Sequence, residues 1–472
     1  MNKGINSQVE IDLLGKFEEK FNIPSRLLLF CFILTLFLWL CSYTRHILFQ
    51  SNVYDLGIFD QWFWLLSKGY PPISSTTKVH VLSDHGAWVI YIFSFLYKLS
   101  ANINWLFFTQ ALSLSFTALP IWLIAKKNNL NQSMCWFVCG LWWLQPVVFN
   151  VNLFDFHPEV WAMPALAGCY LAAKKNNIVL WLILALFVIG CRDGLILVTA
   201  GIGIESVIRK KWKLAITAIG VSVGWFIFIS RWLFPFLKQY SDGAIGATES
   251  IMSNLLYGFL TSPIQELNKI DLSGGIIYLL LISIAFIPIW TKNSLTTLAG
   301  TIPLLMLNFA ADNPSFRTLI HQYNLPIALI GVIAAIEGLS IRRVSKVPIN
   351  KLVWISICWF ALAKPYFFTG PYLARLPQLN SIYNAISMVP KEANVLTTSY
   401  IAPHLSHRRK IMYPKTNSLN KTPLKDFDVI LLNPVDPGWG SSKKLQNKIL
   451  KSARESGWSC LQLKNSLNFC KK

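Results

Sequence analysis

The sequence predicts an all-α polytopic membrane protein of about 11 transmembrane helices, followed by a small soluble α/β domain. Composition supports this class, because 54% of the 472 residues are hydrophobic and only 14% are charged. A water-soluble chain cannot bury so many apolar side chains and keep a polar surface, which excludes cytosolic enzymes and disordered scaffolds. A third observation is a change of character near residue 370, after which the apolar runs become short.

The basic charge of the chain is distributed as membrane topology requires. Lys and Arg number 43 against 22 Asp and Glu, which gives a net charge of +21. A nucleic-acid-binding protein would gather these cations in a continuous stripe, whereas here they occur in short runs between apolar stretches. We therefore expect the lipid bilayer as a partner and no nucleic acid.

The transmembrane domain is expected over residues 27–369, after a polar cytoplasmic segment at 1–26. The run 27–43 has no small-residue cleavage site after it, which indicates an uncleaved anchor helix. The three runs between 160 and 208 are shorter than the roughly 20 residues of a straight span, so tilted or broken helices are expected there. The ten spans predicted after the anchor are 105–125, 134–151, 160–173, 178–191, 194–208, 214–234, 274–290, 295–311, 325–341 and 352–369.

Alternating these spans from a cytoplasmic N-terminus separates the charges by side. The cytoplasmic loops then carry 13 Lys or Arg and no acid, and the opposite loops carry 7 basic and 11 acidic residues. This asymmetry follows the positive-inside rule and predicts a multi-pass protein of the cytoplasmic (inner) membrane. An odd number of spans places the C-terminal domain outside the cytoplasm.

A long first outer loop, 44–104, is expected to hold two helices that lie on the membrane surface. In 56–68 the apolar residues share one side at helical spacing, while Asp60 and Gln61 lie opposite. The apolar run 86–99 is too short for a span, and its aromatic residues suit the level of the lipid headgroups.

Residues 370–472 are predicted to form the extracytoplasmic α/β domain, with a helix capped by Ser442. Cys460 and Cys470 lie in this polar tail, where a disulfide would form if the tail faces an oxidising compartment. The seven other cysteines lie in apolar runs and are expected to serve as small hydrophobic residues. Short β-like runs predict strands over 394–398, 410–413 and 429–432.

Polar residues that could carry chemistry gather in the outer loops. Asp55 could take a proton from an acceptor hydroxyl, or it could cap the helix that follows. Asp84 could also be a helix cap, and His85 beside it could hydrogen-bond a phosphate or a sugar hydroxyl. The stretch 312–323 offers further sugar- or phosphate-contacting groups, or an ordinary loop. The sequence alone leaves both interpretations of each residue open.

The densest polar group is Asp155, His157 and Glu159 in a short outer loop. A proline after His157 favours an extended backbone, in which alternate side chains point to the same side. A divalent cation is one alternative for this group, although the spacing matches no metal signature. Arg192 and Asp193 could form a structural ion pair, or Arg192 could neutralise a lipid phosphate while Asp193 fixes its guanidinium group.

Several common catalytic motifs do not occur in the sequence. These are the P-loop, G-x-S-x-G, H-E-x-x-H and paired C-x-x-C. Most nucleotide-driven pumps, serine hydrolases, zinc proteases and zinc ribbons are therefore excluded.

Six short motifs occur in order along the chain: YDLGIFDQ at 54–61, DH at 84–85, QAL at 110–112, DFHPE at 155–159, CRD at 191–193 and PHLSHR at 403–408. Together they resemble a bacterial family of predicted membrane proteins known as domain of unknown function 2079. That family is grouped with the GT-C membrane glycosyltransferases, which have many helices, a long first outer loop with surface helices and an acid at its start. The resemblance therefore implies a GT-C-like fold for this chain.

The resemblance implies transfer of a hexose or pentose from a polyprenyl-phosphate carrier to a lipid, glycan or protein acceptor of the cell envelope. Asp55 matches the first-loop acid and would be the general base, with the acceptor oxygen in line behind the anomeric carbon. Leu56 follows it where some protein-mannosylating relatives have a second acid, so their substrate class does not transfer. No cofactor is implied, and a divalent cation is left open. Substrate contacts are expected from Asp60, Asp84, His85, Asp155, His157, Glu159, Arg192 and Asp193.

Two other functions stay open. A transporter or flippase of a lipid-linked or anionic solute would place ionisable groups near the middle of the bilayer and often shows related halves, and the sequence shows neither clearly. A non-catalytic membrane protein that contacts anionic lipid or glycan through its basic tail would tolerate replacement of Asp55. The variant Asp55→Asn therefore separates an enzyme from a sensor.

Overall fold

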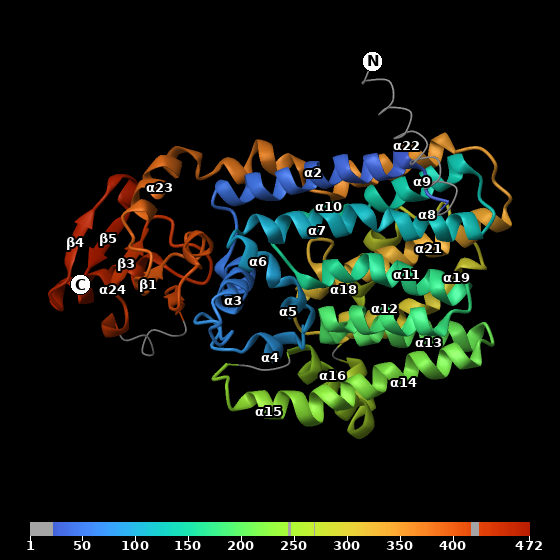
Figure 1. Ribbon diagram of the computed structural model, residues 1–472, viewed down its shortest axis with the longest axis horizontal. Helices are drawn as coiled ribbons and strands as arrows, with labels where there is room; N and C mark the ends of the chain where they lie inside the picture. The colour runs from blue at the N-terminus through green and yellow to red at the C-terminus, as the bar shows by residue number, and fades with distance from the viewer. Residues whose placement is uncertain (1–21, 244–246, 269, 417–423) are drawn as a thin grey trace, which may run out of the picture.

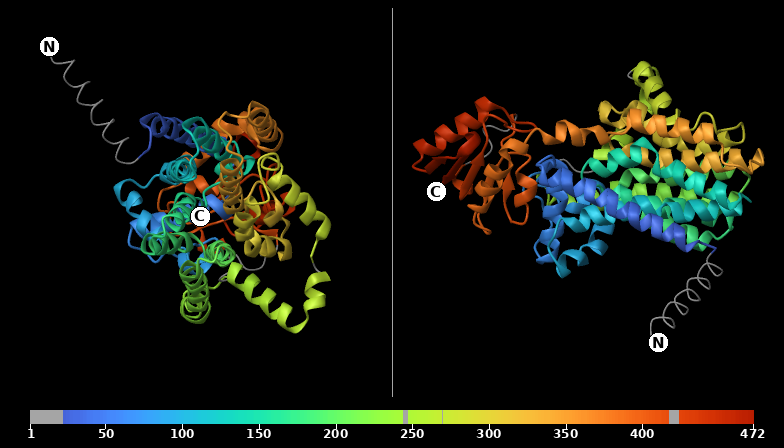
Figure 2. Two further views of the ribbon diagram at one scale, coloured as in Figure 1. Left: turned by 90° about the vertical axis from the view of Figure 1, so that its right-hand side faces the viewer. Right: turned by 90° about the horizontal axis from the view of Figure 1, so that it is seen from above.

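The computed structural model describes residues 22–243, 247–268, 270–416 and 424–472, and these residues are mostly helical. Figure 1 shows long helices lying side by side along the longest axis of the molecule, with a small sheet at one end. The view from above in Figure 2 shows the same order: helix bundle, then first loop, then sheet. Most of the expected cytoplasmic segment 1–26 lies outside the described residues.

Among the described residues, four helices are long and apolar enough to cross a membrane, and two bent pairs raise this number to six. The other predicted runs also contain helices, but these are shorter, so the expectation of eleven spans is not confirmed. The four long helices are Ser25–Ile47 (α2), Asn104–Lys127 (α7, Asn104–Phe116, and α8, Ala118–Lys127), Trp212–Lys238 (α14, Trp212–Phe228, and α15, Phe234–Lys238) and Gln322–Ile341 (mainly α21, Leu325–Ile341).

Both bent pairs break at a proline. Helices α9 (Gln132–Trp143) and α10 (Pro146–Leu153) meet at 45°, and α22 (Ile349–Leu362) meets the segment Pro365–Leu373 at 47°. Proline lacks the N–H that would continue the helix and clashes with the preceding turn, so it begins a new helix in a new direction. The predicted spans at 134–151 and 352–369 are therefore each divided in two.

Two segments among the shorter helices of the bundle pack backbone against backbone. Gly201 of α13 (Ile196–Ile208) lies so close to Gly300 that a Cβ built on Gly201 would stand 1.8 Å from the Gly300 carbonyl oxygen. Only glycine permits this approach of two backbones. The remaining helices of the bundle are α11 (Ala162–Lys174), α12 (Ile178–Cys191), α13 (Ile196–Ile208), α16 (Ala247–Thr261), α17 (Pro263–Asn268), α18 (Leu272–Ser283), α19 (Ser294–Leu298) and α20 (Ile302–Ala310).

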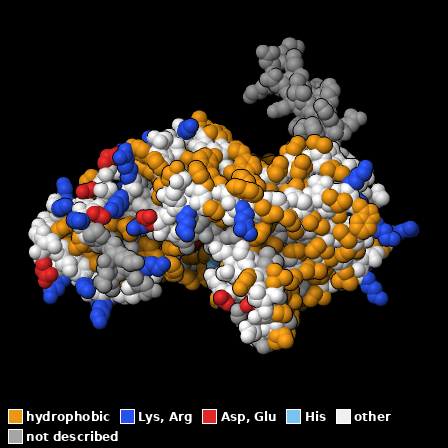
Figure 3. Space-filling model, turned by 90° about the horizontal axis from the view of Figure 1, so that it is seen from below, with side chains coloured by type: hydrophobic (Ala, Val, Ile, Leu, Met, Phe, Trp, Pro, Cys, Tyr) orange, Lys and Arg blue, Asp and Glu red, His pale blue; other side chains and the backbone are white. Residues whose placement is uncertain are grey.

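The surface of the bundle is suited to lipid. Figure 3 shows hydrophobic side chains spread over the helical part, whereas Lys and Arg lie mainly over the sheet end, with a few at the opposite end of the bundle. Large apolar side chains such as Leu29, Phe37, Val179 and Ile216 are exposed there. An apolar surface of this extent is not compatible with water and matches the membrane character expected from the composition.

The first loop lies between the bundle and the sheet (Figure 1). It contains α3 (Ile58–Ser67), α4 (Val81–His85), α5 (Val89–Phe93) and α6 (Phe95–Leu99). The second expected surface helix, 86–99, is divided into α5 and α6 and keeps an exposed apolar face.

Helix α3 does not lie with its polar face open to water, which corrects the expectation for 56–68. Asp60 and Gln61 are both buried. The Asp60 carboxylate accepts hydrogen bonds from Tyr97 Oη at 2.5 Å and from Ser406, and His407 Nε2 lies 3.1 Å from it. The polar face of α3 is therefore covered by Tyr97 of the same loop and by polar groups from the C-terminal part of the chain.

The C-terminal part forms a five-stranded sheet in the order β2-β1-β3-β5-β4. The three predicted strands are present as parallel neighbours, and β5 and β4 continue the sheet antiparallel. The predicted helix is α24 (Lys443–Glu455), whose cap Ser442 accepts the N–H of Leu445 at 3.2 Å. Cys460 and Cys470 are paired across β4 and β5 and form a disulfide. The strands are β1 (Val395–Thr397), β2 (Ile411–Met412), β3 (Val429–Leu432), β4 (Ser459–Gln462) and β5 (Asn468–Lys471), and α23 (Leu379–Ser387) precedes them.

Candidate functional site

Asp55 lies in a single turn of π-helix, Val53–Gly57, immediately before α3. Asn52 caps this turn through its Oδ1, which accepts the N–H of Tyr54 at 3.2 Å, and no side chain caps α3 itself. The capping role considered for Asp55 is therefore taken by Asn52. The Asp55 carboxylate is partly exposed and lies 3.5 Å from His157 Nε2. Short π-turns recur at functional sites because they turn a side chain away from the regular helical face.

Asp155 holds this turn in place from the opposite loop. One of its carboxylate oxygens pairs with Arg45 at the end of α2, and the other accepts the N–H of Asn52 at 3.0 Å. Gln110 fixes the same loop, since its amide donates to the Asp155 carbonyl at 3.0 Å and accepts the N–H of His157 at 3.1 Å. Both Asp155 oxygens are thus engaged within the protein. Arg45 could not be identified from the sequence, because a single arginine at a helix end usually reaches toward the membrane surface.

Glu159 and Arg192 form a buried ion pair, and the Arg192 guanidinium group also lies 5.0 Å from the centre of the Tyr323 ring. The pair considered from the sequence, Arg192 with Asp193, is looser, at 3.9 Å. Burial raises the pKa of Glu159, but the charges of Arg192 and of nearby histidines outweigh it and lower this pKa overall. Glu159 is therefore held as a carboxylate.

His85 joins the two acids that the sequence placed in separate loops. Its ring nitrogens lie 3.4 Å from Asp84 and 3.6 Å from Asp193. Burial and the charge of Arg192 lower its pKa, but Asp84 and Asp193 outweigh them, so the pKa is raised from its ordinary value. Asp84 lies inside α4 and does not cap the helix that follows, since no side chain caps α5.

Seven of the nine residues expected at the site come together through these contacts, and we refer to them as the loop cluster. They are Asp55, Asp84, His85, His157, Glu159, Arg192 and Asp193. Asp155 borders the cluster, whereas Asp60 is engaged by Tyr97, Ser406 and His407. The stretch 312–323 also contributes, since the Phe154 ring packs against both His157 and His321.

The loop cluster holds more acids than cations. Four carboxylates face one guanidinium group and two imidazole rings. In the described part of the chain, no group of three or more His, Cys, Asp or Glu is arranged to hold a metal ion. Chemically, such a cluster can accept protons from hydroxyl groups and orient them. Binding an anion there requires Arg192 or a protonated histidine.

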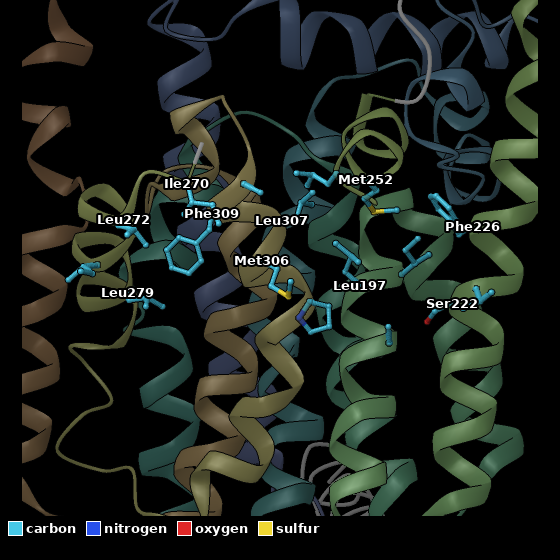
Figure 4. A pocket seen from close by; sticks show the side chains of 17 residues that line it. Leu197, Ser222, Phe226, Met252, Ile270, Leu272, Leu279, Met306, Leu307 and Phe309 are labelled. Atoms are coloured by element: carbon cyan, nitrogen blue, oxygen red, sulfur yellow. The ribbon is translucent and has the colours of Figure 1, made fainter. Parts of the chain in front are cut away.

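A large apolar cavity adjoins the loop cluster. It measures about 840 Å³ and is lined by side chains of α13, α14, α16, α18 and α20, with Ser222 among otherwise apolar neighbours (Figure 4). Leu307 lines both this cavity and a small pocket walled by Glu159, Arg192 and Tyr323. An apolar space and a charged group therefore meet at one place, as they do in binding sites for amphipathic ligands.

Comparison with known proteins agrees with the motifs of the sequence. No curated protein matches the chain. A family model matches residues 45–468, from the end of α2 to the first residue of β5. The chain therefore belongs to the family described as "Predicted membrane protein (DUF2079)".

Proposed function

We propose that this protein is a membrane glycosyltransferase of GT-C type. It would move a sugar from a polyprenyl-phosphate carrier to a lipid, glycan or protein acceptor, with Asp55 as the general base. The proposal rests on one observation above all: the loop cluster stands directly beside the large apolar cavity, with Leu307 bordering both. A carrier lipid has the same two parts, a long apolar chain and a charged head.

The apolar cavity suits the carrier chain. Its volume of about 840 Å³ lies within the roughly 300–1,000 Å³ of pockets that bind small ligands. A chain lying between α13 and α20 would bring its phosphate to the pocket of Arg192 and Tyr323. There the phosphate competes with Glu159 for the guanidinium group, and His85, whose raised pKa favours the charged form, adds positive charge.

Asp55 suits the base because its carboxylate is partly exposed and His157 fixes it from one side. The acceptor oxygen attacks the anomeric carbon, and its proton passes to Asp55 as the new C–O bond forms. The bond between the anomeric carbon and the phosphate oxygen breaks, and the electron pair leaves with the phosphate. Arg192 and His85 stabilise the charge that develops there. Asp155 and Asp60 act as positioning residues.

We further propose that the site faces outward from the cytoplasmic (inner) membrane. The sheet lies at the same end of the bundle as the loop cluster, and its disulfide is of a kind that persists in oxidising compartments. Basic loops belong on the cytoplasmic side. The loops concerned are 126–127, 174–175, 209–213 and 342–351, which come at the ends of helices away from the sheet.

Mass spectrometry of carrier lipids and envelope glycans tests this proposal in cells with and without the gene. Without the gene we expect an accumulated donor lipid or a truncated glycan, and the wild-type gene should reverse it. Asp55→Asn should fail to do so at equal abundance in the membrane, because an amide cannot take the proton. Glu455→Gln, which changes an exposed carboxylate on α24, is the matched control and should restore the product. Restoration by Asp55→Asn would rule out the general base.

A further inference from the structure

Three aromatic side chains from distant segments meet next to Asp55. Tyr54 comes from the π-helical turn, and Tyr413 and Trp439 come from the C-terminal sheet region. The Trp439 ring lies 5.4 Å from that of Tyr54 and 6.1 Å from that of Tyr413, measured between centroids. Lys415 Nζ stands 5.3 Å from the centre of the Tyr54 ring. We call Tyr54, Tyr413 and Trp439 the aromatic surface.

The backbone around Trp439 is shaped to hold this ring outward. Gly438 and Gly440 on either side have φ values of +75° and +71°, which L-residues with a side chain rarely adopt. A Cβ on Gly438 would stand 2.5 Å from Ser399 Oγ, so the inner side of the loop is closely packed. Trp439 nevertheless remains 52% exposed and Tyr54 41% exposed. Large aromatic rings left open at a fixed position are typical of binding surfaces.

A buried hydroxyl group beside these rings lacks a partner. Tyr413 is only 6% exposed, and among the described residues its Oη has no hydrogen-bond partner. Burial is the main cause that raises its pKa, so the phenol keeps its proton. Leaving a buried hydroxyl unpaired is unfavourable, and a polar group of a ligand lying on the aromatic surface would satisfy it.

The aromatic surface is continuous with the proposed general base. Tyr54 directly precedes Asp55 in the π-helical turn. Burial raises the pKa of the Tyr54 phenol, and the negative charges of Asp84 and Asp55 raise it further. A ligand that rests on the rings therefore has a neighbouring hydroxyl within reach of the loop cluster.

A sugar has the two kinds of surface that this arrangement requires. Its ring presents a face of C–H groups, which stacks on an aromatic ring, and a rim of hydroxyl groups, which needs donors and acceptors. The rings of Trp439 and Tyr54 provide the aromatic faces on which the C–H groups can stack, and Tyr413 Oη provides a donor for one hydroxyl group. A lipid acceptor would instead require a continuous apolar path, but Trp439 is followed by Gly440, Ser441 and Ser442.

We propose that the aromatic surface binds a carbohydrate, and that the acceptor of the proposed transferase is accordingly a glycan. Trp439 and Tyr54 hold one sugar ring, Tyr413 donates to one of its hydroxyl groups, and the next hydroxyl reaches Asp55. This inference rests on the proposed function only where it identifies the bound carbohydrate as the acceptor, because the binding surface exists whether or not transfer occurs.

Saturation-transfer NMR on the full-length protein in phospholipid nanodiscs tests the surface directly. The probes are chitotriose, mannotriose and maltotriose, and we expect transfer to the ring C–H protons of at least one. Trp439→Ala should weaken its binding about tenfold, whereas Trp439→Phe, which keeps an aromatic face, should stay within about threefold. Leu461→Ala, at a residue of similar exposure (55%) on the far edge of the sheet, is the matched control and should bind normally.

Failure of this inference differs visibly from failure of the proposed function. If none of the three sugars binds the wild-type protein, or if Trp439→Ala binds as tightly as the wild type, the carbohydrate surface is wrong. A different result is also distinguishable: the protein binds the sugar normally, but deleting its gene leaves the lipids and glycans of the cell unchanged. That result would support the carbohydrate-binding surface and refute the proposed transferase activity.

Discussion

Replacing Asp155 by Asn removes one charge from a buried pair and changes little else. Asp155 has a φ of +84°, and Asn tolerates this left-handed conformation at least as well as Asp does. The Asn side-chain oxygen can still accept the N–H of Asn52, as the carboxylate does at 3.0 Å. The variant therefore isolates the electrostatic contribution of the pair with Arg45.

The size of the effect follows from the burial of the pair. The Asp155 side chain is 1% exposed and that of Arg45 11% exposed. Removing one partner of a buried ion pair typically costs roughly 3–5 kcal/mol, because the other charge stays buried and uncompensated. Arg45 keeps Ser51 Oγ at 3.5 Å and the Tyr372 ring at 5.8 Å. We therefore expect the lower end, a loss of about 3 kcal/mol in the free energy of unfolding.

Two further variants show whether the charge is responsible. Arg45→Gln with Asp155→Asn leaves no unpaired charge, and it should recover most of the lost stability. Asp436→Asn breaks the more exposed pair with Arg375 and should cost less than about 1 kcal/mol. Denaturant titration of each purified variant in detergent provides the comparison. The reasoning is refuted if the single variant lies within about 0.5 kcal/mol of the wild type, or if the double variant is no more stable than the single one.

Two other predictions concern packing and pH. Gly201→Ala would place a methyl group 1.8 Å from the Gly300 carbonyl oxygen and should lower the free energy of unfolding by about 1–3 kcal/mol. The control Gly220→Ala, where no atom lies within 4 Å of the added Cβ, should leave the free energy of unfolding unchanged. Equal losses of stability in the two variants would contradict the close packing at Gly201. Burial lowers the pKa of His407, but Asp60 outweighs it and raises the pKa above 6.5. The stabilisation from the His407–Asp60 pair is complete below pH 6.5 and is lost as the pH rises through the raised pKa of His407. As the pH rises through that pKa, the melting temperature of the wild type should therefore fall more steeply than that of His407→Gln. Parallel plots of melting temperature against pH for the two proteins would exclude a stabilising charge pair.

Local patterns predicted those parts of the fold that depend on neighbouring residues. The strands around 394–398, 410–413 and 429–432 and the cap Ser442 could be located because β-branched runs and capping residues act within a few positions. Strands β4 and β5 were both missed, because the residues of β4 are mostly exposed and resemble a polar loop and β5 has only four residues. The pairing of β4 with β5 becomes recognisable only through the disulfide between Cys460 and Cys470, which joins the two strands.

The candidate site was predictable as a set of residues and not as a geometry. Loops at one end of a bundle must converge, so the acids and histidines of the first loop and of 155–159 could be expected together. Their partners could not, because Glu159 pairs with Arg192 across 33 positions and Asp155 pairs with Arg45 across 110. Such pairings depend on helix packing, for which the sequence holds no local signal.

The contacts of Asp60 also determine the order in which the chain can reach its final state. Tyr97 follows within the same loop, whereas Ser406 comes 346 positions later and His407 347 positions later. During translation, the first loop leaves the ribosome long before these partners are made. The carboxylate must then stay hydrated, because an incompletely paired charge is not buried. Nascent chains arrested before residue 400 should therefore expose α3 to proteases, and release of the complete polypeptide should protect it.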